Sequence, residues 1–415
     1  MPVNFEFILG LIGAVGFYVI WKEQTLKVDK RLLVWLLILF FYWFTNLIAA
    51  IYHQPLGGRG ESVLNVVHSV FLFAVLLIAL FLRKPPIDFF WFLMGVASLS
   101  VIFLMALEIY AQGWITVENA IRLGNTYSHP VKIGVFANTF FIILLGSIPW
   151  AYKRGKLFLS VWVVIILLDF ACVILSQTRT AWIGWPEAMI GWGFYYYYLY
   201  KKQHPITNKV RVFIVLLPVL FIWGLLSIQP VKMVFEKRIA AAYSDVELYM
   251  SGKTFQSSLG HRLLSYEAAI EGIKSSPWIG IGEDAFPVFQ RQMTAKIAEE
   301  KFHKKIKGLH YTHIHNQFLM AWLTKGVFVF LSVLGMFVFL IWYFVNGLKQ
   351  ASSIHKPIWV AGLVFSVASF LSFLPETPLQ KSDTSTHFLL LTTLLLAFSV
   401  LTGRKKPVTI INNSE

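Results

Sequence analysis

The feature that most constrains this chain is a series of apolar stretches, each long enough to cross a membrane. They cover residues 5–21, 32–52, 63–82, 89–112, 131–150, 157–176, 181–200, 210–228, 314–347, 357–375 and 386–402. A helix needs about 20 residues to cross a hydrocarbon core, and backbone polar groups find no other partners there, so the spans are helical. Charged residues make up only 14% of the 415 residues, too few to solvate a water-soluble domain. The sequence therefore predicts an all-α polytopic membrane protein.

A formal net charge of +15 raises the question of nucleic acid, but membrane orientation explains it better. Cytoplasmic loops of membrane proteins are rich in Lys and Arg. One set of alternate loops contains Lys22, Lys27, Lys30, Arg31, Arg83, Lys84, Lys153, Arg154, Lys156, Lys201, Lys202, Lys209, Arg211, Lys349, Lys356, Arg404, Lys405 and Lys406. The opposite short loops hold only Arg59, Arg122, Lys132, Arg179 and Lys381. We therefore predict that the first set is cytoplasmic, that segment 229–311 faces outward, and that nucleic acid is not a partner.

The stretch 314–347 is too long for one simple crossing. It contains Gly326 after the pair His315-Asn316, which favours a short re-entrant or broken helix followed by a full span. The number of spans is then about eleven or twelve. The expected organisation is N-terminal transmembrane helices over 1–228, a large periplasmic segment over 229–313, C-terminal transmembrane helices over 314–402 and a cytoplasmic tail over 403–415.

Two arginines stand out on the predicted outward face. Arg179 lies in a very short turn between two spans, and an arginine so close to hydrocarbon usually pairs with or binds something; the alternative is an arginine that reaches lipid phosphates. Arg262 starts a predicted helix over 260–270, which ends before the turn residues Pro277, Gly280 and Gly282. It could equally be a solvated surface residue.

Three histidines, His310, His313 and His315, precede the return of the chain into the membrane. Their spacing is no standard zinc pattern and no nearby carboxylate or cysteine completes one, so we expect no metal. A single histidine acting as a base suits neutral pH; a helix-end histidine bonded to backbone is the other interpretation. The preceding segment 291–307 is mixed in charge with a basic end and suits an arm lying on anionic headgroups or on an anionic lipid substrate.

These residues resemble the O-antigen ligases, a family related to the O-antigen polymerases. Family members carry a His-Asn or similar pair, nine further residues and Gly, as in His315-Asn316 and Gly326, although Val329 departs from the family pattern. The resemblance extends to the turn 176–182 with Arg179, to Arg262 with Tyr266 and Ala269, to the turn 276–282, and to the outer loop from Arg122 to Pro130. It covers about residues 120–345.

The resemblance implies a GT-C-like membrane glycosyltransferase of the bacterial inner membrane, with its active site facing the periplasm. Its donor would be undecaprenyl-pyrophosphate-linked O-antigen, and its acceptor would be a sugar hydroxyl of lipid A-core. Membrane lipids would surround it and contact it. The implied reaction is inverting and needs neither metal nor another cofactor.

Such chemistry assigns roles to the residues above. Guanidinium groups match phosphate oxygens in two-pronged contacts and can replace a cation, so we expect Arg179 and Arg262 to hold the pyrophosphate. His315 would be the general base, Asn316 would hold that histidine or cap the short helix, and Gly326 would let the broken helix turn back. Arg122 is a lesser candidate for donor contact.

Other functions remain open at this point. An O-antigen polymerase would use the same donor with a growing glycan as acceptor, and a protein O-oligosaccharyltransferase would transfer the glycan to a protein. A transporter could use the acids Glu108, Asp169 and Glu187, which lie within or beside spans, although no inverted repeat is visible. A purely structural membrane protein is the simplest alternative.

Overall fold

The computed structural model describes residues 18, 22, 30–53, 73–80, 83–113, 126–203, 227, 229–352 and 355–403. This part of the chain contains helices and no strand. The helices are α2 (Lys30–His53), α4 (Ile87–Gln112), α5 (Pro130–Leu144), η1 (Leu145–Ser147), α6 (Ile148–Tyr152), α7 (Lys156–Leu175), α8 (Arg179–Gln203), α10 (Gln229–Met250), α11 (Ser258–Ser275), α12 (Phe286–Phe302), α13 (Gln317–Lys325), α14 (Val327–Gln350), α15 (Lys356–Phe373), η2 (Pro378–Gln380) and α16 (Ser382–Gly403). The predicted all-α class is confirmed.

Seven helical segments within the described residues are long and apolar enough to cross a membrane: α2, α4, α5 with α6, α7, α14, α15 and α16. The chain is therefore a multi-pass membrane protein. The span predicted at 181–200 corresponds to α8, which is not one of the seven. Only 73–80 of the span at 63–82 is described, and the spans at 5–21 and 210–228 lie outside the described residues.

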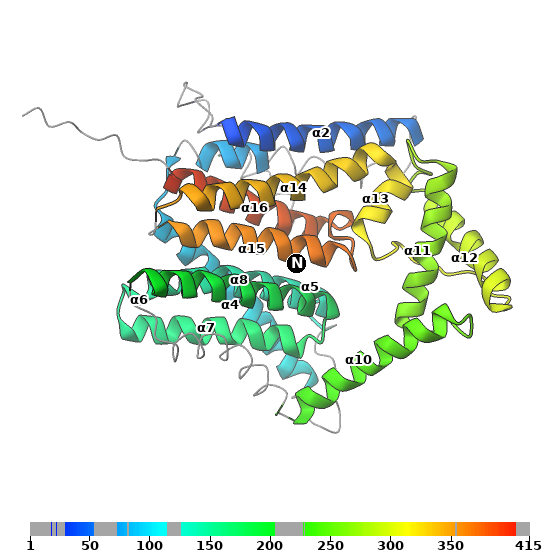
Figure 1. The fold of residues 1–415 in the computed structure, drawn as a ribbon, viewed down its shortest axis with the longest axis horizontal. Coiled ribbons are helices and arrows are strands. Elements are labelled where there is room, and N and C mark those ends of the chain that lie inside the picture. Colours follow the sequence, from blue (N-terminus) through cyan, green and yellow to red (C-terminus); the bar gives the residue numbers. More distant parts are fainter. Residues whose placement is uncertain are drawn as a thin grey trace, which may run out of the picture.

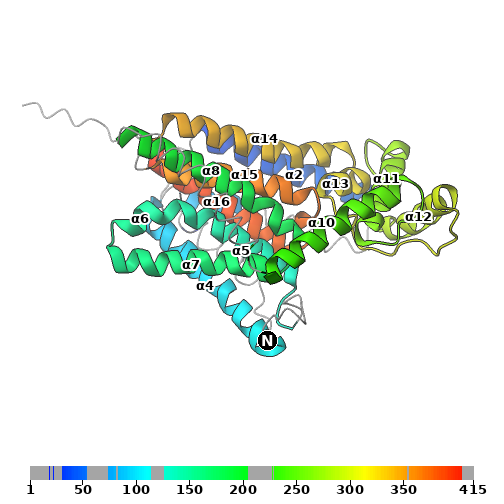
Figure 2. The same cartoon turned by 60° about the horizontal axis from the view of Figure 1, so that its bottom comes forward.

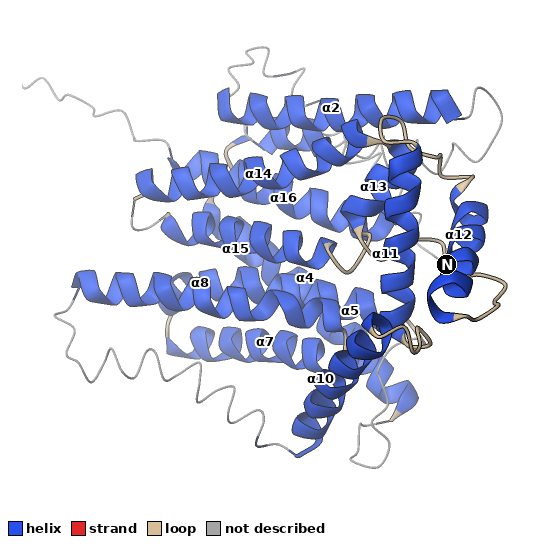
Figure 3. Ribbon diagram, turned by 45° about the vertical axis from the view of Figure 1, so that its right-hand side comes forward, coloured by secondary structure: helices blue, strands red, loops and turns tan. Residues whose placement is uncertain are grey.

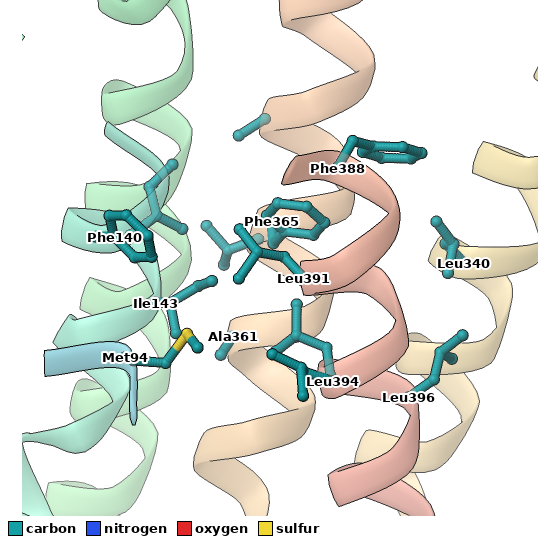
Figure 4. Packing of buried hydrophobic residues seen from close by; sticks show 14 of the residues in the cluster. Met94, Phe140, Ile143, Leu340, Ala361, Phe365, Phe388, Leu391, Leu394 and Leu396 are labelled. Carbon is teal, nitrogen blue, oxygen red and sulfur yellow. The ribbon is translucent and has the colours of Figure 1, made fainter. Parts of the chain in front are cut away.

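The long helices lie side by side in one bundle (Figures 1 and 2). Phe40, Phe92 and Leu157 are examples of large apolar side chains on α2, α4 and α7 that stay exposed, as expected of helix faces that contact lipid. Inside the bundle, apolar side chains of α5, α15 and α16 fill the space between the helices, among them Phe140, Phe365 and Leu391 (Figure 4).

Acidic side chains inside the bundle have structural partners. Glu108 accepts hydrogen bonds from the backbone N–H groups of Thr126, Tyr127 and Ser128 at 3.2, 2.6 and 2.8 Å, and so holds the chain that enters α5. Ser98 donates to Asp169 at 2.7 Å and joins α4 to α7. Two of the three acids that a transporter could have used are thus explained by packing.

The segment predicted to face outward, 229–311, contains α10, α11 and α12, which form a helical layer at one end of the bundle (Figures 1 and 3). The helix predicted over 260–270 is α11, whose N-cap Ser257 accepts from Gly260 N at 2.9 Å. The predicted arm over 291–307 is helical only as far as Phe302, where α12 ends; His303 adopts a left-handed conformation with φ 52°. Lys30, Lys153, Lys349 and Lys356 lie at or next to the ends of α2, α6, α14 and α15; the side of the membrane that they face stays a prediction.

The stretch 314–347 is broken as predicted, into the short helix α13 and the span α14. Gly326 separates them with φ 85°, a conformation that only glycine adopts without strain. A Cβ atom at this position would lie 2.1 Å from the Trp278 carbonyl oxygen. The turn after α11 therefore packs directly against the break, and Val327 N donates to Pro277 O at 3.1 Å.

Replacing Gly326 by alanine tests this account of the break. We expect Gly326→Ala to lose about 1–3 kcal/mol of stability, because the left-handed backbone is strained for alanine, with a further loss from the contact with Trp278. Gly335→Ala is the matched control, since Gly335 lies inside α14 with no atom within 4 Å of an added Cβ. Thermal unfolding in detergent measures both variants, and equal melting temperatures would contradict the account.

Candidate functional site

The candidate site forms where α13 begins. Asn316 is the N-cap of α13 and accepts from Leu319 N at 3.0 Å through its side chain. His315 immediately precedes it in a left-handed conformation with φ 56°. The cap fixes the start of the helix, and the turn before it sets the direction of the His315 side chain.

Glu376 brings three distant parts of the chain together at this point. It lies between Pro375 and Thr377, in the connection from α15 to η2, and is only 9% exposed. Its Oε2 atom is 3.7 Å from His315 Nδ1, and its Oε1 atom is 3.7 Å from Arg262 Nη2 on α11. Arg262 Nη1 also donates to Pro375 O at 3.3 Å. One carboxylate thus faces both a guanidinium and an imidazole.

Further hydrogen bonds fix this arrangement. Tyr266 on α11 donates through its hydroxyl to the His315 carbonyl at 2.8 Å. Gln317 in the first turn of α13 accepts from Leu379 N at 2.9 Å. The first bond ties α13 to the helix that carries Arg262, and the second ties it to the segment that follows Glu376.

The charges of the site follow from burial and from these neighbours. Burial alone would raise the pKa of Glu376, but the contact with His315 and the positive charge of Arg262 outweigh it and lower the pKa below its usual value. Glu376 is therefore a carboxylate at neutral pH. Burial, aided by the neighbouring positive groups, lowers the pKa of His313 to about 4. Its ring centroid lies 4.2 Å from that of His315, so a neutral imidazole stands beside the candidate base.

Arg179, expected to contact the same substrate, is the first residue of α8, and only its backbone is described. The next residues, Thr180 and Ala181, line a cavity between α5, α8, α15 and α16 that Pro378 borders on another side. Pro378 follows Glu376 by two residues, so the cavity that the start of α8 lines also borders the segment that carries Glu376. Arg262 and His315 do not line this cavity, and Arg122 lies outside the described residues.

Sequence reasoning did not single out Glu376 as a residue of the site. Its position between Pro375 and Pro378, directly after a predicted span, was the available signal, but nothing in the sequence indicates which helix it faces. Glu283, another acid near α13, forms an ion pair with Lys325.

Comparison with known proteins identifies a family segment that contains part of the site. Residues 162–334 match the family described as O-Antigen ligase, which confirms the resemblance over that segment. The matched residues include Arg179, Arg262, His315, Asn316 and Gly326, whereas Arg122 and Glu376 fall outside them. The chain is also 26% identical over 389 residues to a protein of Haemophilus influenzae described as uncharacterized, covering 91% of this chain and 88% of that protein.

The lowered pKa of His313 predicts a stability that depends on pH. Between its ordinary pKa of about 6.5 and the value of about 4 in the fold, the unfolded chain takes up a proton that the folded protein does not. The contribution of His313 to the free energy of unfolding is therefore fully present above pH 6.5 and is lost as the pH falls toward 4. We expect His313→Asn to reduce the fall in melting temperature between pH 7 and pH 5. His310→Asn, at an exposed position of the same segment, should leave that fall unchanged; equal behaviour of the two variants would refute the assignment.

Proposed function

Since residues 162–334 carry an O-antigen ligase family domain, we propose that this protein is a membrane glycosyltransferase that acts as an O-antigen ligase. It transfers a glycan from undecaprenyl pyrophosphate to a sugar hydroxyl of lipid A-core. The observation that carries the proposal is the convergence of Arg262, His315 and Glu376 within 3.7 Å contacts at one end of the bundle. The site faces the periplasm of a bacterium with the protein in its inner membrane.

The reaction is a displacement at the anomeric carbon of the glycan. The acceptor oxygen forms the new bond, the bond from the anomeric carbon to the pyrophosphate oxygen breaks, and the pyrophosphate leaves with the bonding electrons. Charge therefore grows on the leaving group while the acceptor hydroxyl must lose a proton. A site for this reaction needs fixed positive donors and a base.

Arg262 supplies a donor of this kind. Its guanidinium already contacts an anion, the Glu376 carboxylate, and a pyrophosphate presents more charge and more acceptor oxygens to the same fork of N–H groups. Arg179 at the start of α8 is the second donor of the proposal. Removing one preorganised donor at such a site typically costs about 10²–10³ in rate.

His315 is the base of the proposal. Its Nδ1 atom faces Glu376, which leaves Nε2 to accept the proton of the acceptor hydroxyl. The carboxylate orients the ring and offsets the positive charge that the ring gains, as an acid partner does for a histidine base in general. Glu376 is thus a positioning residue for His315.

A transfer assay with purified protein, undecaprenyl-pyrophosphate-linked glycan and lipid A-core in detergent tests this function. We expect His315→Ala to lower the rate by about 10²–10⁴-fold, the range typical of general base catalysis. His310→Ala is the control, because His310 is exposed on the same segment.

Two outcomes would contradict the proposal. A His315→Ala protein that transfers glycan at the wild-type rate rules out the base. A wild-type protein that lengthens the glycan on its lipid carrier, without forming a lipid A-core product, is a polymerase.

A further inference from the structure

Lys325, the last residue of α13, makes two contacts that the proposed reaction does not use. Its Nζ atom lies 3.0 Å from Glu283 Oε1, in the connection between α11 and α12. It also donates to Asn46 Oδ1 on α2 at 2.9 Å. The Lys325 side chain is 13% exposed and that of Glu283 is 28% exposed, so this ion pair is largely withdrawn from water.

The Asn46 side chain has a fixed orientation when it accepts the hydrogen bond from this ammonium group. It is buried on α2, and its Nδ2 atom donates to the Tyr42 carbonyl at 2.7 Å. The amide is thereby held with its oxygen toward Lys325. A further contact joins α2 to the connection between α11 and α12: His53, at the end of α2, lies 3.2 Å from the Ile279 carbonyl oxygen.

The connection that carries Glu283 also closes the end of α13. Ile281 N and Gly282 N donate to the carbonyls of Leu323 and Thr324 at 2.8 and 3.0 Å. Trp322 Nε1 donates to Pro277 O at 2.9 Å. The first two bonds satisfy carbonyl groups that the end of α13 leaves without partners in the helix. The same connection follows directly after α11, the helix of Arg262.

Removing one charge of a pair withdrawn from water leaves the other without compensation, which costs more than replacing both. A cation at the last residue of a helix also interacts favourably with the helix dipole. Loss of either partner therefore leaves a largely buried charge without compensation at the end of α13.

We propose that Lys325 and Glu283 are a positioning pair, which holds α13 against α2 and the α11–α12 connection and so sets where His315 stands relative to Arg262. Lys325 is at the opposite end of α13 from His315, a length of about 13 Å for nine residues at 1.5 Å each. The pair acts through the helix and touches no reacting atom. The effect of the pair on activity rests on the proposed function, whereas its effect on the position of α13 does not.

The test compares Lys325→Met, Glu283→Gln and the double variant with the wild-type protein. The control is Glu271→Gln, which breaks the ion pair of Lys274 with Glu271 on α11, of 2.7 Å but with 65% and 48% exposed side chains. Such surface pairs contribute little. Hydrogen exchange at the amides of Ile281, Gly282 and residues 317–325 is measured beside kcat and the KM for the lipid-linked donor.

We expect Glu283→Gln to raise amide exchange in these segments by about tenfold or more and to lower kcat, with the donor KM within about twofold of wild type, since Arg262 is untouched. The double variant should lie closer to wild type than Glu283→Gln, because it leaves no lone charge. Glu271→Gln should match wild type in both measurements.

Unchanged exchange in both single variants would overturn the proposal, whatever the activity. Raised exchange with an unchanged kcat would overturn the positioning role, since the pair would then hold the helix without affecting His315. If the wild-type protein transfers no glycan, the proposed function fails while the exchange measurement still decides whether the pair holds α13.

Discussion

The contact of the Glu376 carboxylate with Arg262 and His315 is the interaction on which the candidate site depends. These residues come from α11, from the turn before α13 and from the connection after α15, which are brought together only by the packing of the bundle and its end layer. A carboxylate that is only 9% exposed is stable there because the Arg262 guanidinium and the His315 imidazole face it. The remaining features of the site, from the Asn316 cap to the Tyr266 hydrogen bond, keep those partners in place.

The membrane explains why so much of the fold could be predicted. Apolar stretches of about 20 residues must be helical in hydrocarbon, so the positions of α2, α4, α7, α14 and α15 followed from hydropathy. The break at Gly326 was predictable for the same reason, since a stretch of that length exceeds one crossing. The compartments on the two sides, and the role of each arginine, remain predictions from charge and from the family.

Contacts between distant segments could not be predicted in the same way. Glu376 follows a predicted span and Asn46 lies within one, and no periodic pattern points either of them to a partner. The partner of Glu283 is Lys325, whose position in the sequence favours no particular contact. Such pairs depend on how helices are rotated and stacked, and the apolar pattern of a helix surrounded by lipid and by other helices restricts rotation weakly. Burial and ion-pair geometry, which only the structure supplies, identified them.

An experimental structure with undecaprenyl pyrophosphate bound would test the central claim most directly. The account predicts pyrophosphate oxygens within hydrogen-bond distance of the Arg262 guanidinium, which would exchange its contact with Glu376 for the ligand, while His315 keeps its Nδ1 side toward Glu376. A pyrophosphate bound elsewhere, with the contact between Arg262 and Glu376 intact, would contradict it.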